Sequence, residues 1–405
     1  MTRYLLPVLF LAGSLVIPIY QATHDRIAAW DEPFWFMRAQ VAPFDFDGYK
    51  HQVMAVDQLA LQRWVFWPAL RLTGLDVVGP DERPIWEMKD GHMYYLERGY
   101  VPWRTPDSWK AMDLRRYTVE EWNDVHGEYA PRRAIVLLRL VNVCMYGLML
   151  VCLWLAARMA LRSETLAILP ALPFVLLPFW NGHMSFILAS GDVFLLCGFS
   201  ATLALWLRCH LGGGASWKSA MALGVLGGLT TSAKHPGVLV VAAVCGYLFL
   251  EGRRWLRLEL PLLSFAVAVC VFVALNPVIW LCPGRTPAEV LSWISRCRQV
   301  HAAEVAAANL TVPISQMSQN LSFLWAALPA TVMLAWGMRT NRWLKPVLWW
   351  GCFIAVGVTA GLFALLDPQP RYFAPVELAV FFTLTLCGTA IVSSAALRSS
   401  RGTSS

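Results

Sequence analysis

The chain has 405 residues, of which 57% are hydrophobic and 15% charged, and its formal net charge at pH 7 is +7. Soluble domains carry roughly 25% charged residues, so this composition, with its several long apolar runs, excludes a soluble globular, disordered or collagen-like protein and indicates an integral membrane protein. Residues 22–133 hold 18 Asp and Glu against 14 Lys and Arg, a balance of −4, and the rest of the chain carries +11. A membrane protein with one large hydrophilic loop therefore accounts for the charge without a nucleic-acid partner.

The apolar runs predict about ten membrane-spanning helices, and hence an all-α polytopic membrane protein that forms one domain over residues 1–405. The first run, residues 5–20, ends without the small-residue cleavage pattern of a signal peptide, so we interpret it as a retained signal anchor. Residues 219–233 and 236–250 are shorter than the ~20 residues of a full crossing, and they fit either two tilted spans or a re-entrant hairpin. The other predicted spans are 134–157, 165–180, 186–207, 260–281, 321–338, 346–366 and 372–397.

Basic residues concentrate in alternate short loops, and this pattern predicts the orientation of the chain. Both termini, including a tail at 398–405, are predicted to be cytoplasmic, so residues 22–133 and 281–320 are extracytoplasmic loops. We expect a bacterial or archaeal plasma membrane rather than the endoplasmic reticulum. Lys234 and Arg371 are exceptions, because they lie in short loops on the outer side. Each of them either snorkels to the interface or binds an anionic group there.

The first outer loop carries adjacent carboxylates about ten residues after the first span, at Asp31 and Glu32. Carboxylates so close to a membrane are partly desolvated, which raises their pKa toward values that suit proton abstraction. The same residues, followed by Pro33, also fit the N-terminus of a helix. Both interpretations are compatible with one another.

The same loop is rich in aromatic residues, among them Trp30 and Trp35. Aromatic faces beside carboxylates suit sugar binding, although Trp and Tyr also anchor chains at membrane interfaces. Within this loop, residues 54–73 are typical of an interfacial amphipathic helix that is interrupted at Pro68.

The second outer loop, residues 281–320, contains a helix start in which Thr286 and Glu289 form a capping box with Pro at the first helical position. This pattern predicts an amphipathic helix to about residue 307 that lies across the outer membrane surface. Cys282 and Cys297 are able to form a disulfide if they face an oxidising compartment.

The middle of the chain places ionisable residues next to the outer membrane face. Lys234 and His235 lie at a break between two apolar runs, where they suit an anionic lipid headgroup. Asp192 lies in a span that begins on the outer side, and His183 lies in the loop before it. Asp192 therefore either binds a substrate or orders Lys234.

The last predicted span begins with Arg371 and Tyr372. Arginine holds phosphate oxygens with two parallel donors, which lysine does not do. Glu377, six residues further on, is either functional or a structural partner for Arg139, the lone base inside the second span.

Four short motifs occur in a fixed order on the outer side: WDEPFWFMRA, ASGDVFLLCGF, GLTTSAKHPGVLVV and PRYFAPVELAVF. As an ordered set they resemble the type-C (GT-C) glycosyltransferases of the protein-mannosyltransferase and aminoarabinose-transferase kind, families 39 and 83. The resemblance covers most of the chain, although the first loop has no clear His-Pro-Pro-Leu-like segment. It implies a polyprenyl- or dolichyl-phosphate-linked sugar donor and transfer at the extracytoplasmic face to a lipid, glycan or protein acceptor.

Combined with this resemblance, the residues predict an inverting displacement in which Asp31 is the general base and Glu32 its alternate or orienting neighbour. Donor-phosphate binding is assigned to Lys234, His235, Arg371 and Tyr372, and substrate binding to Asp192, His183, Trp30 and Trp35.

No cofactor is required by this scheme. The Cys and His spacings indicate no metal site, although a divalent metal ion is compatible with the chemistry. Two other functions use the same residues. A transporter or flippase of lipid-linked saccharides needs the bases but no carboxylate base, and a non-catalytic family member needs neither.

Overall fold

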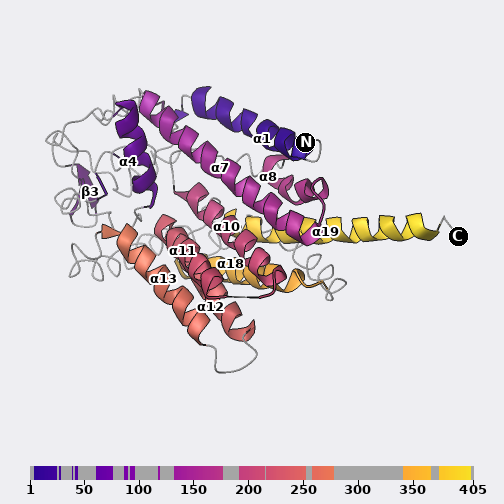
Figure 1. The fold of residues 1–405 in the computed structure, drawn as a ribbon. Helices are drawn as coiled ribbons and strands as arrows, with labels where there is room; N and C mark the ends of the chain where they lie inside the picture. Colours follow the sequence, from indigo (N-terminus) through magenta and orange to yellow (C-terminus); the bar gives the residue numbers. More distant parts are fainter. Residues whose placement is uncertain are drawn as a thin grey trace, which may run out of the picture.

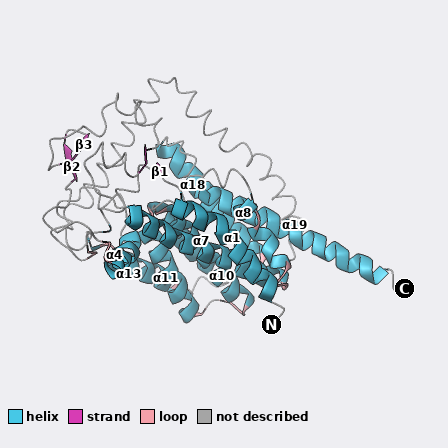
Figure 2. Ribbon diagram, turned by 90° about the horizontal axis from the view of Figure 1, so that it is seen from above, coloured by secondary structure: helices cyan, strands magenta, loops and turns pink. Residues whose placement is uncertain are grey.

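The computed structural model describes the chain in segments that include most of the predicted spans. These are residues 4–24, 27–28, 39, 42–43, 61–75, 86–89, 92–95, 117–118, 132–176, 191–214, 216–251, 258–277, 341–365 and 374–402. Helices dominate these segments, and the strands are short (Figures 1 and 2). The protein is an all-α polytopic membrane protein, as the sequence predicted.

The helical elements follow the chain in an order that alternates long apolar helices with short connectors. They are α1 (Leu5–His24), α4 (Leu61–Thr73), α7 (Arg132–Leu161), the 3-10 helix η3 (Leu166–Ala171), α8 (Pro173–Leu176), α10 (Asp192–Leu211), α11 (Trp217–Ala233), the 3-10 helix η5 (His235–Gly237), α12 (Val238–Glu251), α13 (Glu259–Leu275), α18 (Leu344–Leu365) and α19 (Ala374–Gly402). Two antiparallel strand pairs lie in the first loop: β1 (Ile27–Ala28) with β4 (Tyr117–Thr118), and β2 (Trp86–Lys89) with β3 (His92–Tyr95).

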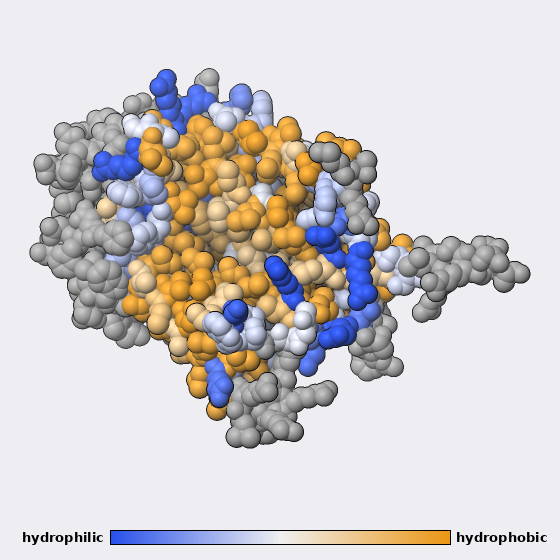
Figure 3. Space-filling view, in the orientation of Figure 1, coloured by the Kyte–Doolittle hydropathy of each residue, from blue (hydrophilic) through white to orange (hydrophobic). Residues whose placement is uncertain are grey.

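Among the described helices, four are long and apolar enough to cross a membrane: α1, α7, α10 and residues 374–394 of α19. The 20 residues of α10 give a length of about 30 Å, close to the thickness of a bilayer hydrocarbon core. Shorter apolar helices occur at His235–Phe249, Glu259–Leu275 and Leu344–Ala360. Figure 3 shows a broad apolar surface over this bundle, bordered by hydrophilic residues, as lipid contact requires.

Three predicted elements differ from the structure. Residues 166–176 form η3 and then a single turn, α8, instead of one span over 165–180, because Pro170 and Pro173 supply no amide hydrogen for a continuous helix. The interfacial helix begins at residue 61 and continues through Pro68, which lies inside α4 and does not interrupt it. The open question at 219–250 is answered by two helices, α11 and α12, joined by η5. The predicted span 321–338 lies outside the described residues.

The bundle packs α7 against α10 and α11 against α13, and α1 lies along the outer side of α7 (Figure 1). In α11, Gly224 and Gly228 form the small-xxx-small pattern that lets membrane helices approach closely. A Cβ atom at Gly228 would lie 2.6 Å from the carbonyl oxygen of Ala268 in α13. The two helix backbones are therefore in direct contact, and α11 is fixed against α13 along its length.

This contact predicts that Gly228→Ala destabilises the protein by about 1–3 kcal/mol, because the added methyl overpacks the α11–α13 interface. The matched control is Gly388→Ala in α19, where no atom lies within 4 Å of the added Cβ. That control is expected to be neutral or to gain about 0.5–1 kcal/mol from helix propensity. Thermal unfolding of the purified protein in detergent measures both, and equal stability of the two variants would contradict the close contact.

Candidate active site

An ion pair joins two elements at the end of the bundle where α10 begins. Asp192 is the first residue of α10, and Lys234 is the residue at which α11 ends. The ammonium nitrogen Nζ of Lys234 donates a hydrogen bond to Oδ1 of Asp192. The carboxylate side chain is 8% exposed and the lysine side chain 30% exposed, so one partner is buried and the other is partly open. A cation that is anchored on one side and open on the other is suited to an anionic ligand.

The backbone at Lys234 explains why the cation lies at this position. Lys234 is extended, with φ −162° and ψ 148°, while its amide still bonds the carbonyl oxygen of Thr230 at 3.4 Å. Two residues later Pro236 excludes continuation of α11, and η5 turns the chain directly into α12. His235 begins η5 and is partly exposed. The break that the sequence showed therefore presents Lys234 and His235 together at one end of two helices.

Gln62 of α4 holds the two sides of the ion pair together. Its Nε2 atom donates to the carbonyl oxygen of Ala233 at 2.6 Å and lies 3.5 Å from that of Gly191. These carbonyls belong to the residues that directly precede Lys234 and Asp192. Gln62 is fully buried, and a Cβ atom at Gly191 would lie 2.3 Å from its Nε2. A single amide therefore fixes the spacing between the two charged residues.

Sequence reasoning missed Gln62, although a signal was present. Gln62, Phe66 and Leu70 are spaced four residues apart in α4, and each has an exposed fraction of 0%. A polar amide on the buried stripe of an amphipathic helix needs hydrogen-bond partners inside the protein. That rule would have marked Gln62 as a residue with an internal role, but not its partners.

A second polar contact lies next to the pair, where α13 ends. Asn276 is 1% exposed and donates from Nδ2 to Oγ of Ser232 at 3.0 Å and to the carbonyl oxygen of Phe272 at 2.7 Å. Trp64 of α4 donates from Nε1 to the carbonyl oxygen of Leu275 at 2.8 Å. The ends of α4, α10, α11 and α13 therefore meet around Asp192 and Lys234, and hydrogen bonds fix their relative positions.

Comparisons with known proteins identify the fold that carries this site. Residues 133–280 match the family model of the dolichyl-phosphate-mannose-protein mannosyltransferases. The oligosaccharyltransferase of Archaeoglobus fulgidus in its apo form superimposes with a TM-score of 0.52 at 12% identity, over 99% of this chain and 52% of that one. The chain has the fold of a type-C glycosyltransferase. The resemblance that the sequence motifs indicated is thereby confirmed.

The same archaeal enzyme in complex with zinc and sulfate superimposes on the type-C fold of this chain with a TM-score of 0.50 at 11% identity, over 96% of this chain and 51% of that one. The chain thus spans about half the length of these structural relatives. No curated protein matches its sequence significantly. The family match includes Asp192, Lys234 and His235.

Within this type-C fold, the structure brings Asp192 and Lys234 together, which is one of the two arrangements that the sequence left open. The other predicted site residues lie outside the described residues, so their positions stay predictions: Trp30, Asp31, Glu32, Trp35, His183, Arg371 and Tyr372. The predicted helix and disulfide of the second outer loop also lie outside them.

Two further ionisable residues are buried in spans of the type-C bundle. Arg139 of α7 is 1% exposed and Glu377 of α19 is 2% exposed, and these two helices contact each other. Their pairing stays a prediction. Among the described residues, no three His, Cys, Asp or Glu side chains form a group that suits a metal ion.

We expect Gln62→Leu to separate the two carbonyls that the amide holds, because it removes the donor and leaves both acceptors buried. Loss of such a donor costs about 1–3 kcal/mol. The displaced Lys234 is then expected to lower the turnover of the lipid-linked donor about tenfold, since small misplacements of a binding group are costly. Leu72→Ala on the same helix is the control, because Leu72 is 88% exposed. Wild-type turnover in Gln62→Leu would remove Gln62 from the site.

Proposed function

We propose that the chain transfers a sugar from a polyprenyl- or dolichyl-phosphate donor to a lipid, glycan or protein acceptor at the extracytoplasmic membrane face. The observation that carries the proposal is the half-buried Asp192–Lys234 pair at the end of the bundle, within residues 133–280 that match a dolichyl-phosphate-mannose transferase family. A cation held in this way at a membrane face fits the phosphate of a lipid-linked donor.

Lys234 is the proposed anchor for the donor phosphate. Its ammonium group has three donors, one of which is directed to Asp192, and the exposed side of the group remains available to a phosphate oxygen. Arg371, His235 and Tyr372 complete the anion site in this proposal. As the bond between the anomeric carbon and the phosphate oxygen breaks, negative charge grows on the phosphate, and fixed cations stabilise that charge. Asp192 acts by holding Lys234.

The acceptor side of the reaction depends on the first outer loop. Asp31 accepts the proton of the acceptor hydroxyl or amine while the acceptor atom attacks the anomeric carbon, and Glu32 orients or replaces it. The new glycosidic bond forms as the lipid phosphate leaves from the opposite face, so the anomeric configuration is inverted. Trp30 and Trp35 stack on the sugar, and His183 contacts the substrate. The displacement requires no metal ion.

The test is incubation of the purified protein, in detergent, with a radiolabelled polyprenyl-phosphate sugar and an acceptor extract. A glycosyltransferase releases free polyprenyl phosphate and labels the acceptor, even though detergent micelles have no two sides. A flippase or a non-catalytic scaffold binds the donor but leaves it intact. Intact donor after prolonged incubation with hexose- and pentose-linked donors alike would overturn the proposal.

A further inference from the structure

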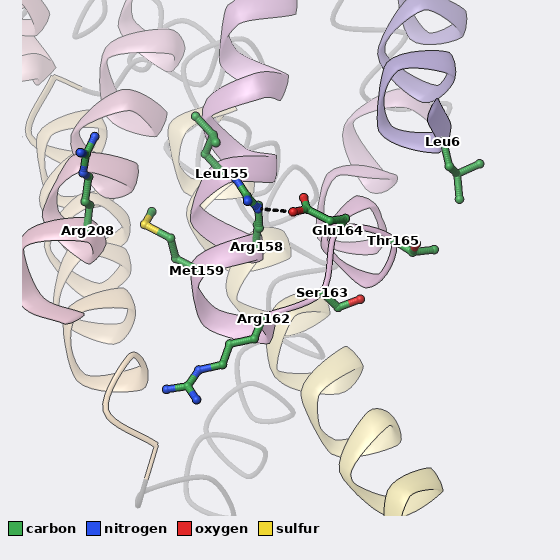
Figure 4. Close-up of a pocket in the computed structure, with 9 residues that line it drawn as sticks. All are labelled: Leu6, Leu155, Arg158, Met159, Arg162, Ser163, Glu164, Thr165 and Arg208. Atoms are coloured by element: carbon green, nitrogen blue, oxygen red, sulfur yellow. Dashed lines mark ion pairs between the residues drawn. The ribbon is translucent and has the colours of Figure 1, made fainter. Parts of the chain in front are cut away.

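A second polar site lies at the opposite end of α10. A cavity of about 880 Å³ opens between the ends of α7 and α10, the first turn of α1 and the segment that leads into η3 (Figure 4). Arg208 lines it from the last turn of α10, 16 residues after Asp192, which corresponds to roughly 24 Å along the helix. The cavity is therefore distinct from the proposed site of sugar transfer, and it lies on the face that the charge pattern predicts to be cytoplasmic.

The cavity has an excess of positive charge. Arg158, Arg162 and Arg208 line it together with Glu164, whose Oε1 lies 2.7 Å from Nε of Arg158. This ion pair neutralises one arginine. Within the segments that the structure describes, Arg162 and Arg208 are exposed and have no ion pair. Two guanidinium groups on different elements thus remain available to a ligand.

The backbone of Arg162 is unusual for its residue type. Its φ is 54°, in the left-handed region that favours glycine, directly after the end of α7. Glycine or asparagine is the usual residue at such a helix end, because a Cβ atom is strained there. An arginine in this position sacrifices backbone comfort to place a guanidinium group at the cavity. This strain is an observation independent of the cavity and of the charge count.

The wall that faces α1 is apolar. Leu6 of α1 lines the cavity together with Leu155 and Met159 of α7. Leu6 is 50% exposed, and its neighbours Leu5 and Leu9 are each 57% exposed on the outer side of the bundle. A ligand in this cavity therefore meets arginines at one side and a lipid-facing helix at the other. That combination fits an amphipathic anion better than a free inorganic ion.

We propose that this pocket binds the phosphate headgroup of an anionic glycerophospholipid. Arg162 and Arg208 hold the phosphate oxygens, since guanidinium groups do so with paired donors, and an acyl chain lies along α1. Basic pockets between membrane helices on the cytoplasmic side bind anionic headgroups in this manner. Glu164 holds Arg158 at the edge of the pocket, so two arginines and not three carry the interaction.

The experiment titrates phosphatidylglycerol into the purified full-length protein in detergent and reads binding by native mass spectrometry, with phosphatidylcholine as the comparison lipid. The wild type is expected to prefer phosphatidylglycerol. Arg162→Gln/Arg208→Gln is expected to bind it about 25-fold more weakly, at about fivefold per arginine. Lys218→Gln removes one charge from the exposed start of α11 outside the pocket and is expected to stay within twofold of the wild type.

A single variant separates binding from folding. Arg162→Gly relieves the left-handed backbone, so it is expected to raise the midpoint of thermal unfolding while it weakens phosphatidylglycerol binding about fivefold. A purely structural arginine does not give opposite changes in the two readouts. Unchanged lipid binding in both arginine variants overturns the proposal. Full displacement of the lipid by inorganic phosphate at equal concentration also overturns it, because the ligand is then free phosphate.

Discussion

Replacement of Lys234 by methionine is expected to lower the turnover of a polyprenyl-phosphate sugar by roughly 100- to 1000-fold, the range for removal of one group that stabilises developing charge. Methionine keeps the aliphatic length of the side chain but removes the ammonium group that contacts Asp192. The leaving phosphate then loses a fixed cation at the moment at which its charge grows. Release of free polyprenyl phosphate measures this loss.

The single variant also leaves the Asp192 carboxylate buried without its partner, and breaking a buried pair costs about 3–5 kcal/mol. The double variant Asp192→Asn/Lys234→Met removes both charges and is the matched control. It is expected to regain stability, as read by thermal unfolding, without regaining turnover. If the double variant turns over the donor at the wild-type rate, the pair is a structural contact and the assignment of Lys234 to the phosphate is wrong.

Asp31→Asn is expected to slow transfer by roughly 100- to 10,000-fold, because an amide accepts no proton and positioned general bases contribute about this much. The substitution leaves the proposed phosphate site unaltered, so the donor concentration at half-maximal rate should change little. Steady-state kinetics at saturating acceptor separate the two quantities. A loss confined to the maximal rate is the signature of a base.

Asp113→Asn, at another acid of the same outer loop, is the control for Asp31→Asn and should retain wild-type kinetics. Glu32→Gln is expected to have a smaller effect than Asp31→Asn, since Glu32 orients its neighbour. The reverse order would assign the base to Glu32. Wild-type transfer in both variants would exclude a carboxylate base from this part of the chain.

The helices that the sequence located well are those whose apolar runs are uninterrupted. Residues 134–157 were predicted as a span and belong to α7, Arg132–Leu161, because hydropathy alone sets the limits of such a helix. Residues 165–180 failed for a local reason, since Pro170 and Pro173 break the backbone hydrogen bonding that the apolar pattern leads one to expect. Hydropathy reports that a segment is buried in lipid or protein, but not that its helix is continuous.

The site was predictable in its residue types but not in its contacts. Lys234 was conspicuous because it is a base on the side where bases are rare, and Asp192 because it is an acid at the start of a span. Their contact joins residues 42 apart in the chain, so it depends on how α10 and α11 pack. Gln62 was invisible for the same reason, because its acceptors are backbone carbonyls 129 and 171 residues away. No sequence pattern specifies a hydrogen bond to a distant main-chain atom.

The most direct measurement compares release of free polyprenyl phosphate from a lipid-linked sugar by three purified proteins: the wild type, the stabilised double variant Asp192→Asn/Lys234→Met, and Leu72→Ala. The site described above predicts release by the wild type and by Leu72→Ala at similar rates, and at least 100-fold slower release by the double variant. Equal release by all three proteins, or intact donor with all three, would contradict a sugar transfer that depends on Lys234.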